Sequence, residues 1–303
     1  MSAAARVLDS DIFYSFRRRP GVILAAAVTL AFVVAAVFAP WVAPHNPFDL
    51  ATLNLLDAFT PPAWTGNGNP AYPLGTDDQG RDVLSAIIFG SRMSLLVGLL
   101  ATVLAMVVGV ILGLVSGYAG GNVDAFIMRV ADVQLSFPAI LIALLVDGLA
   151  RAALPKEMQD QLAFYVLVLA IASSGWVRYA RTVRGSTLVE RNKEYVQAAR
   201  VIGRHPAAIV FTHVLPNALG PVLVLVTLHI SEAIITEATL SFLGVGVPPT
   251  QPSLGTLIRI GNDFLFSGEW WITVFPGAAL VMLVLAINVL GDWLRDALNP
   301  RLR

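Results

Sequence analysis

Ionisable residues interrupt two of the apolar stretches in this chain of 303 residues. Glu232 and Glu237 lie in one stretch, and ionisable side chains inside a membrane are costly and mark transport paths or proton relays. Because five residues of a helix turn through about 500°, these two carboxylates face different directions. Both are therefore candidates for a translocation path, one lining it and the other holding a neighbouring helix. His229 is interpreted as a local hydrogen-bond partner three residues before Glu232, not as a metal ligand.

The remaining charged residues in apolar stretches favour structural roles. Arg129 and Asp132 are three residues apart, a spacing that allows them to pair across one helical turn. Asp147 is expected at the outer water interface.

Enzyme chemistry has little support in the sequence. The segment Ala172-Ser173-Ser174-Gly175 lacks the first glycine of a serine nucleophile turn, and no His partner is apparent. The chain has no Cys, which excludes disulfides, thiol catalysis and Cys-ligated zinc. A phosphate-binding loop carries Gly-Lys followed by Ser or Thr, whereas Lys156 and Lys193 follow Pro155 and Asn192. We predict no catalytic residue, no metal ligand and no ATP site on this chain.

An acidic segment rich in glycine precedes one apolar stretch. It reads Leu74-Gly75-Thr76-Asp77-Asp78-Gln79-Gly80-Arg81-Asp82, and Asp and Gly at this density favour tight turns. Three carboxylates are also the ligands that calcium prefers, although the spacing departs from that of an EF-hand loop. We favour a structural cap at the head of the following helix, carried by Gly75, Thr76, Asp77, Gly80, Arg81 and Asp82.

A basic, amphipathic segment follows Arg178. Tyr195, Ala198, Ala199 and Ile202 recur at helical spacing, which predicts a short helix with these residues on one face. Gly203 stands where a left-handed residue ends a helix.

A second short helix is expected directly after that turn. Arg204 and His205 follow the glycine, and Pro206 is suited to the first position of a helix. We expect this helix to run to Val214, before Leu215-Pro216 turns into the next apolar stretch. The helix-turn-helix either lies on anionic lipid or docks a cytoplasmic partner.

The composition identifies the solvent around the elements that carry these residues. Apolar types make up 56% of the chain, and Asp, Glu, Lys and Arg make up only 13%, about half of the usual share in soluble domains. A soluble fold of this size could not bury that much apolar surface, so we expect a protein embedded in lipid. The net charge of zero argues against nucleic acid as a partner.

Six membrane-spanning helices are predicted, since each needs about 20 apolar residues. They cover residues 21–41, 93–116, 125–149, 162–178, 218–242 and 271–291. If both termini are cytoplasmic, 15 of the 20 Lys and Arg residues fall on the cytoplasmic side, in agreement with the positive-inside rule. The expected organisation is a cytoplasmic segment 1–20, a first span 21–41, an outside loop 42–91 and a membrane core 92–303.

The basic loop resembles that of a known family. Ala198-Ala199, Gly203 and Leu215-Pro216 match the "EAA" loop of permease subunits of bacterial ABC importers. Gln197 stands where the first Glu is usual and His213 where an apolar residue is usual, whereas Glu194 offers a nearby acid. The resemblance implies that residues 188–217 dock into a groove of an ATPase subunit and transmit its motion.

Two further motifs are similar to those of C-type permeases from dipeptide, oligopeptide and nickel importers. They are Gly75–Val83, followed by Gly90-Ser91-Arg92-Met93-Ser94-Leu95, and Glu237-Ala238-Thr239-Leu240-Ser241-Phe242-Leu243-Gly244. The resemblance implies an all-α, type I ABC importer permease fold in the bacterial cytoplasmic (inner) membrane. It also implies a second, B-type permease subunit, two ATP-binding subunits that hold ATP and Mg, and an extracytoplasmic substrate-binding protein.

The same resemblance implies which residues couple ATP hydrolysis to transport. The expected coupling residues are Glu194, Tyr195, Ala198, Ala199, Arg200, Gly203, Arg204, His205, Pro206, Leu215 and Pro216. The implied function is import of di- or oligopeptides, with nickel chelate, glutathione or another peptide-like solute as alternative cargo. A proton-coupled carrier that uses Glu232, Glu237 and Asp132 is the alternative from a different class.

Overall fold

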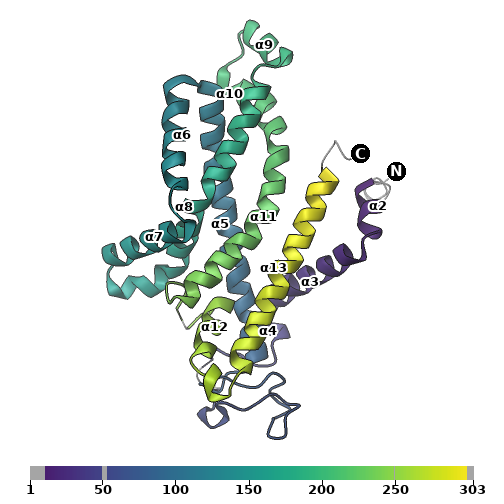
Figure 1. The fold of residues 1–303 in the computed structure, drawn as a ribbon, viewed down its shortest axis with the longest axis vertical. Coiled ribbons are helices and arrows are strands. Elements are labelled where there is room, and N and C mark those ends of the chain that lie inside the picture. The colour runs from purple at the N-terminus through teal and green to yellow at the C-terminus, as the bar shows by residue number, and fades with distance from the viewer. Residues whose placement is uncertain (1–10, 50–52, 249, 299–303) are drawn as a thin grey trace.

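The computed structural model describes residues 11–49, 53–248 and 250–298, and within these ranges the fold is all-α (Figure 1). The chain begins with α2 (Asp11–Arg17), α3 (Pro20–Val37) and the short α4 (Ala39–Val42). The long helices α5 (Val83–Ala119), α8 (Lys156–Glu190), α11 (Leu215–Phe242) and α13 (Trp271–Leu298) form the body of the bundle.

Shorter elements connect these long helices. They are η1 (Leu55–Asp57), α6 (Gly121–Leu135), α7 (Ala139–Ala153), α9 (Glu194–Val201), α10 (Pro206–Ile209), the π-helical turn η2 (Val210–Val214), α12 (Leu254–Asn262) and η3 (Leu265–Ser267). Figure 1 shows α9 at one end of the molecule, which we call the α9 end. The opposite end carries α12 and residues 44–49 and 53–82 and is called the α12 end.

Five helices are long and apolar enough to cross a membrane, and a bent pair of helices supplies a sixth span. That pair, α6 and α7, replaces the single straight helix predicted over residues 125–149, and its two halves meet at 96°. The break falls at Ser136-Phe137-Pro138. Proline lacks an N–H and disfavours the helical conformation of the residue before it, so the chain turns there. The predicted count of six therefore depends on taking the bent pair as one span.

Other helices extend well beyond their apolar centres. The span predicted over 93–116 starts ten residues earlier, at Val83, and the one predicted over 162–178 belongs to a helix of 35 residues. Apolar stretches mark the part of a helix that lipid must cover, whereas the helix itself continues until a cap or a glycine ends it. The hydropathy of the sequence therefore located these helices but underestimated their length.

Glycines on α5 allow it to pack directly against α8. An added Cβ at Gly109 would lie 2.4 Å from Tyr179 Cβ, and one at Gly113 would lie 2.6 Å from the backbone oxygen of Ala180. Small residues four apart let two membrane helices approach closely. The α5–α8 contact is the most extensive helix–helix contact in the described structure.

The two described ends of the chain lie side by side (Figure 1). Arg19 Nη1 pairs with Asp296 Oδ2 at 3.0 Å, and the rings of Phe16 and Trp293 meet with centroids 5.2 Å apart. The two described ends of the chain therefore lie on the same side of the bundle.

Candidate functional site

At the α9 end, α9 stops where the sequence predicts. Gly203 adopts φ +77°, the left-handed conformation that favours glycine. Its N–H donates to the Arg200 oxygen at 3.0 Å, and the N–H of Arg204 donates to the Ala199 oxygen at 3.1 Å. These are the two hydrogen bonds of a Schellman motif, so this turn closes α9 with satisfied carbonyl groups.

The second helix starts as predicted but does not end at Val214. Pro206 is its first residue, and His205 Nδ1 accepts a hydrogen bond from the Ala207 N–H at 3.3 Å. The helix then passes through one π turn, in which the Leu215 N–H bonds to the Val210 oxygen, and continues directly into α11. Pro216 has no backbone N–H to donate, and the helix continues past it through the wider π turn without a break. The expected turn at Leu215-Pro216 was therefore wrong, and the loop is joined stiffly to α11.

The buried face of α9 also differs from the prediction. Val196 and Ala199 are buried against Ile209 and Val214. Tyr195, Ala198 and Ile202, which were expected beside Ala199, are exposed. Helical spacing predicted which residues share a face of α9, but it could not show which face packs against Ile209 and Val214.

Large apolar side chains are exposed around the α9–α10 turn. Val201 is 87% exposed, Ile202 77% and Phe211 65%. Val201 and Ile202 lie at the end of α9 and Phe211 lies in η2, and exposed large apolar side chains of this kind are candidates for an interaction site. We call Val201, Ile202 and Phe211 the tip cluster.

Polar contacts brace this turn against its neighbours. Tyr195 donates its hydroxyl to Glu190, and this hydrogen bond raises the pKa of Tyr195. Asn217 Nδ2 in turn donates to the Tyr195 hydroxyl at 3.2 Å. The two positions that depart from the family pattern also have partners, because Gln197 Nε2 donates to the Arg191 oxygen and His213 Nε2 lies 3.1 Å from Arg204 Nη1.

At the α12 end, the acidic glycine-rich segment is used internally. Arg81 Nε pairs with Asp77 Oδ2 at 2.6 Å, and both side chains are almost fully buried. The Trp271 indole donates to the Thr76 oxygen at 3.0 Å, which ties the segment to α13. Gly75 and Gly80 both adopt positive φ, at +83° and +75°. The predicted turn structure is therefore confirmed.

The last residue of this segment caps α5. Asp82 Oδ2 accepts from the Ser85 N–H at 2.9 Å, the arrangement that satisfies a free donor in the first turn of a helix. The prediction of a structural cap is thus confirmed for Asp82. Asp78 has a pKa above its usual range, because burial and the neighbouring Asp77 both disfavour its charge. Among the described residues, no group of three or more His, Asp and Glu is arranged to hold a metal ion.

Glu232 and Glu237 occupy opposite environments, as their spacing predicts. Glu237 is fully buried, where it accepts hydrogen bonds from Ser94 Oγ at 2.8 Å and Ser241 Oγ at 2.7 Å. Ser94 Oγ also accepts from the Leu254 N–H at 3.2 Å. Glu237 therefore joins α5, α11 and the start of α12, which is a structural contact.

Glu232, in contrast, is paired at an accessible surface. Both of its oxygens accept from the guanidinium of Arg178 on α8, and each side chain is nearly half exposed. The expected hydrogen bond between His229 and Glu232 is not found. His229 Nδ1 instead lies 3.1 Å from the Tyr179 hydroxyl in the interior.

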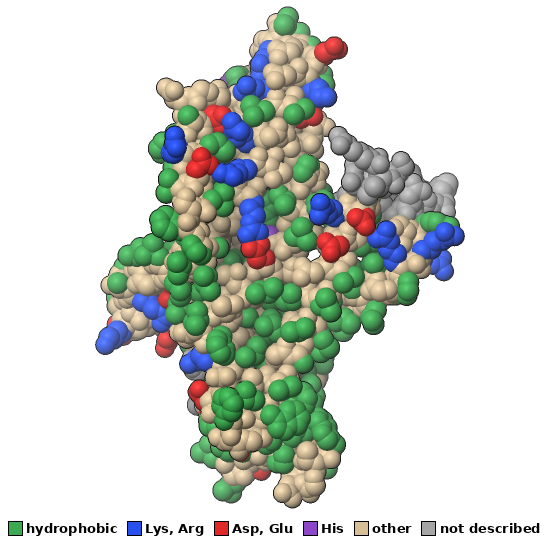
Figure 2. All heavy atoms as spheres, viewed as in Figure 1, with side chains coloured by type: hydrophobic (Ala, Val, Ile, Leu, Met, Phe, Trp, Pro, Cys, Tyr) green, Lys and Arg blue, Asp and Glu red, His purple; other side chains and the backbone are tan. Residues whose placement is uncertain are grey.

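Arg178 belongs to a row of arginines along α8. Arg181 pairs with Asp132, and Arg184 pairs with Asp124 through two hydrogen bonds of 2.5 and 2.6 Å. The predicted Arg129–Asp132 pair was therefore wrong, because the partner of Asp132 lies on α8 and not on α6. Figure 2 shows the acidic and basic side chains gathered in the half of the bundle that includes α6 and α9.

One prediction about α7 differs from the structure, and one about α8 agrees with it. Asp147 is 3% exposed and pairs with Arg151 Nε at 2.6 Å, so it is buried instead of facing water. Ser173 and Ser174 donate to the carbonyl oxygens of Ala170 and Ile171 in the middle of α8. Neither serine lies on a nucleophile turn.

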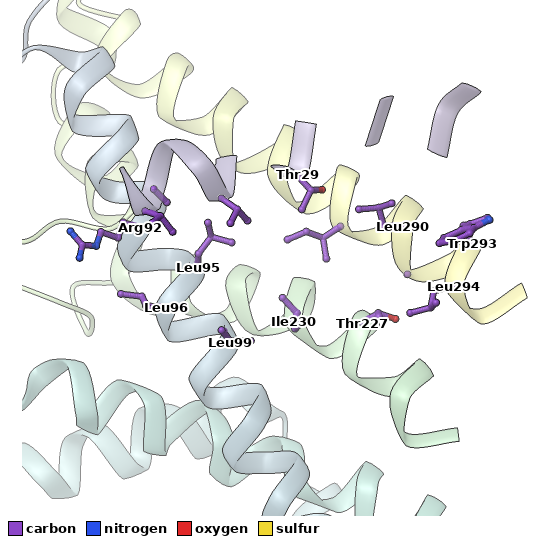
Figure 3. Close-up of a pocket in the computed structure, with 15 residues that line it drawn as sticks. Thr29, Arg92, Leu95, Leu96, Leu99, Thr227, Ile230, Leu290, Trp293 and Leu294 are labelled. Atoms are coloured by element: carbon purple, nitrogen blue, oxygen red, sulfur yellow. The ribbon is translucent and has the colours of Figure 1, made fainter. Parts of the chain in front are cut away.

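Two large cavities flank Arg92 on α5. One, of about 570 Å³, is almost entirely apolar and lies between α3, α5, α11 and α13 (Figure 3). The other, of about 760 Å³, lies between α5, the first turns of α8 and residues 250–252. Sequence reasoning did not single out Arg92, although a cation in an apolar stretch was an available signal.

Comparison with known proteins identifies the family. Residues 109–303 match the family described as binding-protein-dependent transport system inner membrane component, and residues 10–62 match the N-terminal TM domain of oligopeptide transport permease C. The chain belongs to this family of inner-membrane permeases.

Named relatives align with this permease along most of its length. The dipeptide transport system permease protein DppC of Haemophilus influenzae is 38% identical over 97% of this chain and 95% of its own. DppC of Escherichia coli K12 is 40% identical over 97% of this chain and 93% of its own. The oligopeptide transport system permease protein OppC of Bacillus subtilis is 36% identical over 98% and 90%.

Solved structures share the fold. The MetNI methionine ABC transporter in an inward-facing conformation superimposes with a TM-score of 0.55 at 18% identity, over 71% of this chain and 96% of that chain. An amino acid ABC transporter solved with histidines gives a TM-score of 0.52 at 17% identity, over 70% and 94%. The permease is thus a multi-pass inner-membrane protein with the fold of ABC importer permease subunits.

Proposed function

We propose that this permease is the C-type membrane subunit of an ATP-driven importer of di- and oligopeptides. Relatives named for dipeptide and oligopeptide transport cover almost the whole chain. The observation in the structure that carries the proposal is the tip cluster, an apolar surface on a rigidly braced turn at the α9 end.

In this proposal the α9–α10 turn docks into an ATPase subunit in the cytoplasm. Val201 and Ile202 enter an apolar groove of that subunit, and the turn residues 203–206 set the angle between α9 and α10. Because α10 continues through η2 into α11, movement of the groove tilts α11 as a lever. ATP and Mg are held by the two ATPase subunits, and this chain supplies no catalytic group.

Glu232 is our candidate for the translocation path. It is accessible together with Arg178, whereas Glu237 is buried among serines and holds helices together. The path is completed by a second permease subunit, and an extracytoplasmic binding protein delivers cargo to the α12 end. Both termini and the α9 end then lie in the cytoplasm, in agreement with the distribution of Lys and Arg.

The docking proposal is tested by the double variant Val201→Asp and Ile202→Asp in the assembled importer. Two charges in an apolar contact remove its hydrophobic contribution and must be desolvated, so association with the ATPase subunits should fall by about 100-fold or more. Co-purification of the ATPase subunits and ATP-driven peptide uptake in vesicles are measured.

A matched control is available at the opposite end of the molecule. Phe266 is 97% exposed near η3, and Phe266→Asp should leave ATPase association unchanged. Normal co-purification of the ATPase subunits with the double variant would contradict the docking role. Uptake that continues without ATP but stops when the proton gradient collapses would instead favour a proton-coupled carrier.

A further inference from the structure

The more polar of the two cavities beside Arg92, at the α12 end, is called the polar cavity and has walls suited to a peptide. Its volume of about 760 Å³ is within the usual range for small-molecule sites. The amides of Asn46, Gln161 and Gln251 line it together with apolar and aromatic side chains, among them Phe89 and Phe164. Amide side chains can donate to and accept from a peptide backbone, and aromatic rings cover apolar side chains.

Arg92 is the one charged residue among the described residues that line this cavity. It lies about 14 Å along α5 from the first residue of the helix, and its side chain is exposed. No acid within the described parts of the chain forms an ion pair with it. A cation on a membrane helix needs a partner, so the structure leaves Arg92 ready for an anionic ligand.

The direction of the side chain indicates which cavity receives its charge. Arg92 also borders the apolar cavity of Figure 3, but there its guanidinium points away from Leu95 and Leu290. The aliphatic part of the side chain contacts apolar surface while the charged group extends beyond it, as long basic side chains commonly do. The polar cavity is the one bordered by Arg92 that also offers amide groups.

A terminal carboxylate is the anion that these walls fit best. Arg binds a carboxylate through two parallel hydrogen bonds, and a peptide continues from that carboxylate into amides that Asn46, Gln161 and Gln251 can match. A lipid phosphate would also neutralise Arg92, but its acyl chains would leave those amides without partners.

We propose that this cavity binds the imported peptide, with Arg92 holding its C-terminal carboxylate. The inference rests on the proposed function, because it requires peptide cargo arriving at the α12 end. It assigns to the permease itself a contact with the cargo that is separate from recognition by the binding protein.

The test uses the assembled importer of both permease subunits and both ATPase subunits in lipid nanodiscs, without the binding protein. The probe is the dipeptide alanyl-photoleucine, whose diazirine attaches to nearby residues on illumination. Labelling should map to residues 89–96 and 161–165, and Arg92→Gln should lower it about tenfold, since a charge-assisted bidentate contact is lost. Arg92→Lys keeps the positive charge but cannot form two parallel hydrogen bonds, so its labelling should lie between that of the wild type and that of Arg92→Gln.

Two controls separate carboxylate recognition from a general loss of charge. Lys156 is an exposed residue five positions before Gln161, and Lys156→Gln should leave labelling unchanged. The C-terminal amide of the probe should label the wild-type importer as weakly as the free acid labels Arg92→Gln, and should lose nothing further in that variant. Intact assembly of Arg92→Gln is checked by co-purification of all four subunits.

Equal labelling of the wild type and Arg92→Gln would overturn the proposal. Loss of bound phospholipid from Arg92→Gln, with dipeptide labelling unchanged, would also overturn it and assign Arg92 to a lipid headgroup. Peptide uptake with the binding protein is measured on the same wild-type preparation. Absence of uptake contradicts the proposed function, whereas uptake combined with labelling that is independent of Arg92 contradicts this site alone.

Discussion

The two ends of the permease differ in how their sequence motifs use charged side chains. At the α12 end, the charged residues Asp77, Arg81 and Asp82 are buried, with Asp77 paired to Arg81 and Asp82 capping α5. At the α9 end, the backbone N–H groups of Gly203 and Arg204 are hydrogen-bonded within the turn, but the side chains of the tip cluster are exposed. A segment whose charged side chains are buried and paired holds a structure in place, whereas one that exposes apolar side chains on a braced turn is prepared for a partner.

This contrast separates two motifs that both stand out in the sequence. The acidic segment is rich in groups that can do chemistry, yet the structure uses Asp77, Arg81 and Asp82 to hold the outer loop and the head of α5. The basic loop also carries many ionisable groups, but the surface proposed for docking is apolar.

The largest expected change in stability comes from breaking the buried ion pair at the α12 end. Arg81→Leu leaves Asp77, which is 3% exposed, without its cation. Removing one partner of a buried pair costs about 3–5 kcal/mol, so unfolding of the purified permease should shift to much lower denaturant concentration. Arg204→Leu is the matched control at the α9 end, where an exposed substitution should change stability by about 0.5 kcal/mol or less. Equal losses in the two variants would remove the contrast between the ends.

A smaller loss is expected at Glu237, which links α5, α11 and α12. Glu237→Ala removes the acceptor for Ser94 and Ser241 and should cost about 2–3 kcal/mol, because buried donors lose their partners and a cavity forms. Glu237→Gln keeps an acceptor and the side-chain volume, so it should cost less. Thermal unfolding followed by circular dichroism compares the three proteins. A Gln variant as unstable as the Ala variant would show that the charge of Glu237, not its hydrogen bonds, holds the contact.

The smallest effect is a gain in stability at Asp78. Because burial and Asp77 raise its pKa in the folded chain, the charged form is disfavoured by folding. Asp78→Asn should therefore stabilise the protein near pH 7, by about 0.5 kcal/mol or less. The advantage should shrink as the pH falls through the raised folded-state pKa and vanish below the ordinary value of 3.8. Unfolding midpoints of both proteins between pH 3 and pH 7 provide the measurement, and a gain that persists at low pH would contradict this explanation.

Local features were the ones that the sequence predicted well. Gly203 ends α9, Pro206 opens α10 and Asp82 caps α5, because each effect depends on backbone conformation within a few residues. The apolar stretches located the spanning helices for the same reason, since crossing lipid requires a continuous apolar surface.

Features that depend on packing between helices were predicted poorly. Asp132 pairs with Arg181 instead of Arg129, and His229 approaches Tyr179 instead of Glu232. Nothing within one helix distinguishes a partner on the same helix from one on a neighbouring helix. The buried side of α9 was misassigned for the same reason, because Val196 and Ala199 are selected by contacts with Ile209 and Val214.

Cross-linking from the tip cluster tests the account most directly. The chain has no Cys, so Ile202→Cys provides a single attachment point for a maleimide-benzophenone reagent in the assembled importer with its binding protein. The account predicts that illumination joins this permease to an ATPase subunit, whereas the same reagent on Phe266→Cys does not reach it. Cross-links from position 202 to the binding protein, or to lipid alone, would contradict the assignment of the α9 end as the coupling surface.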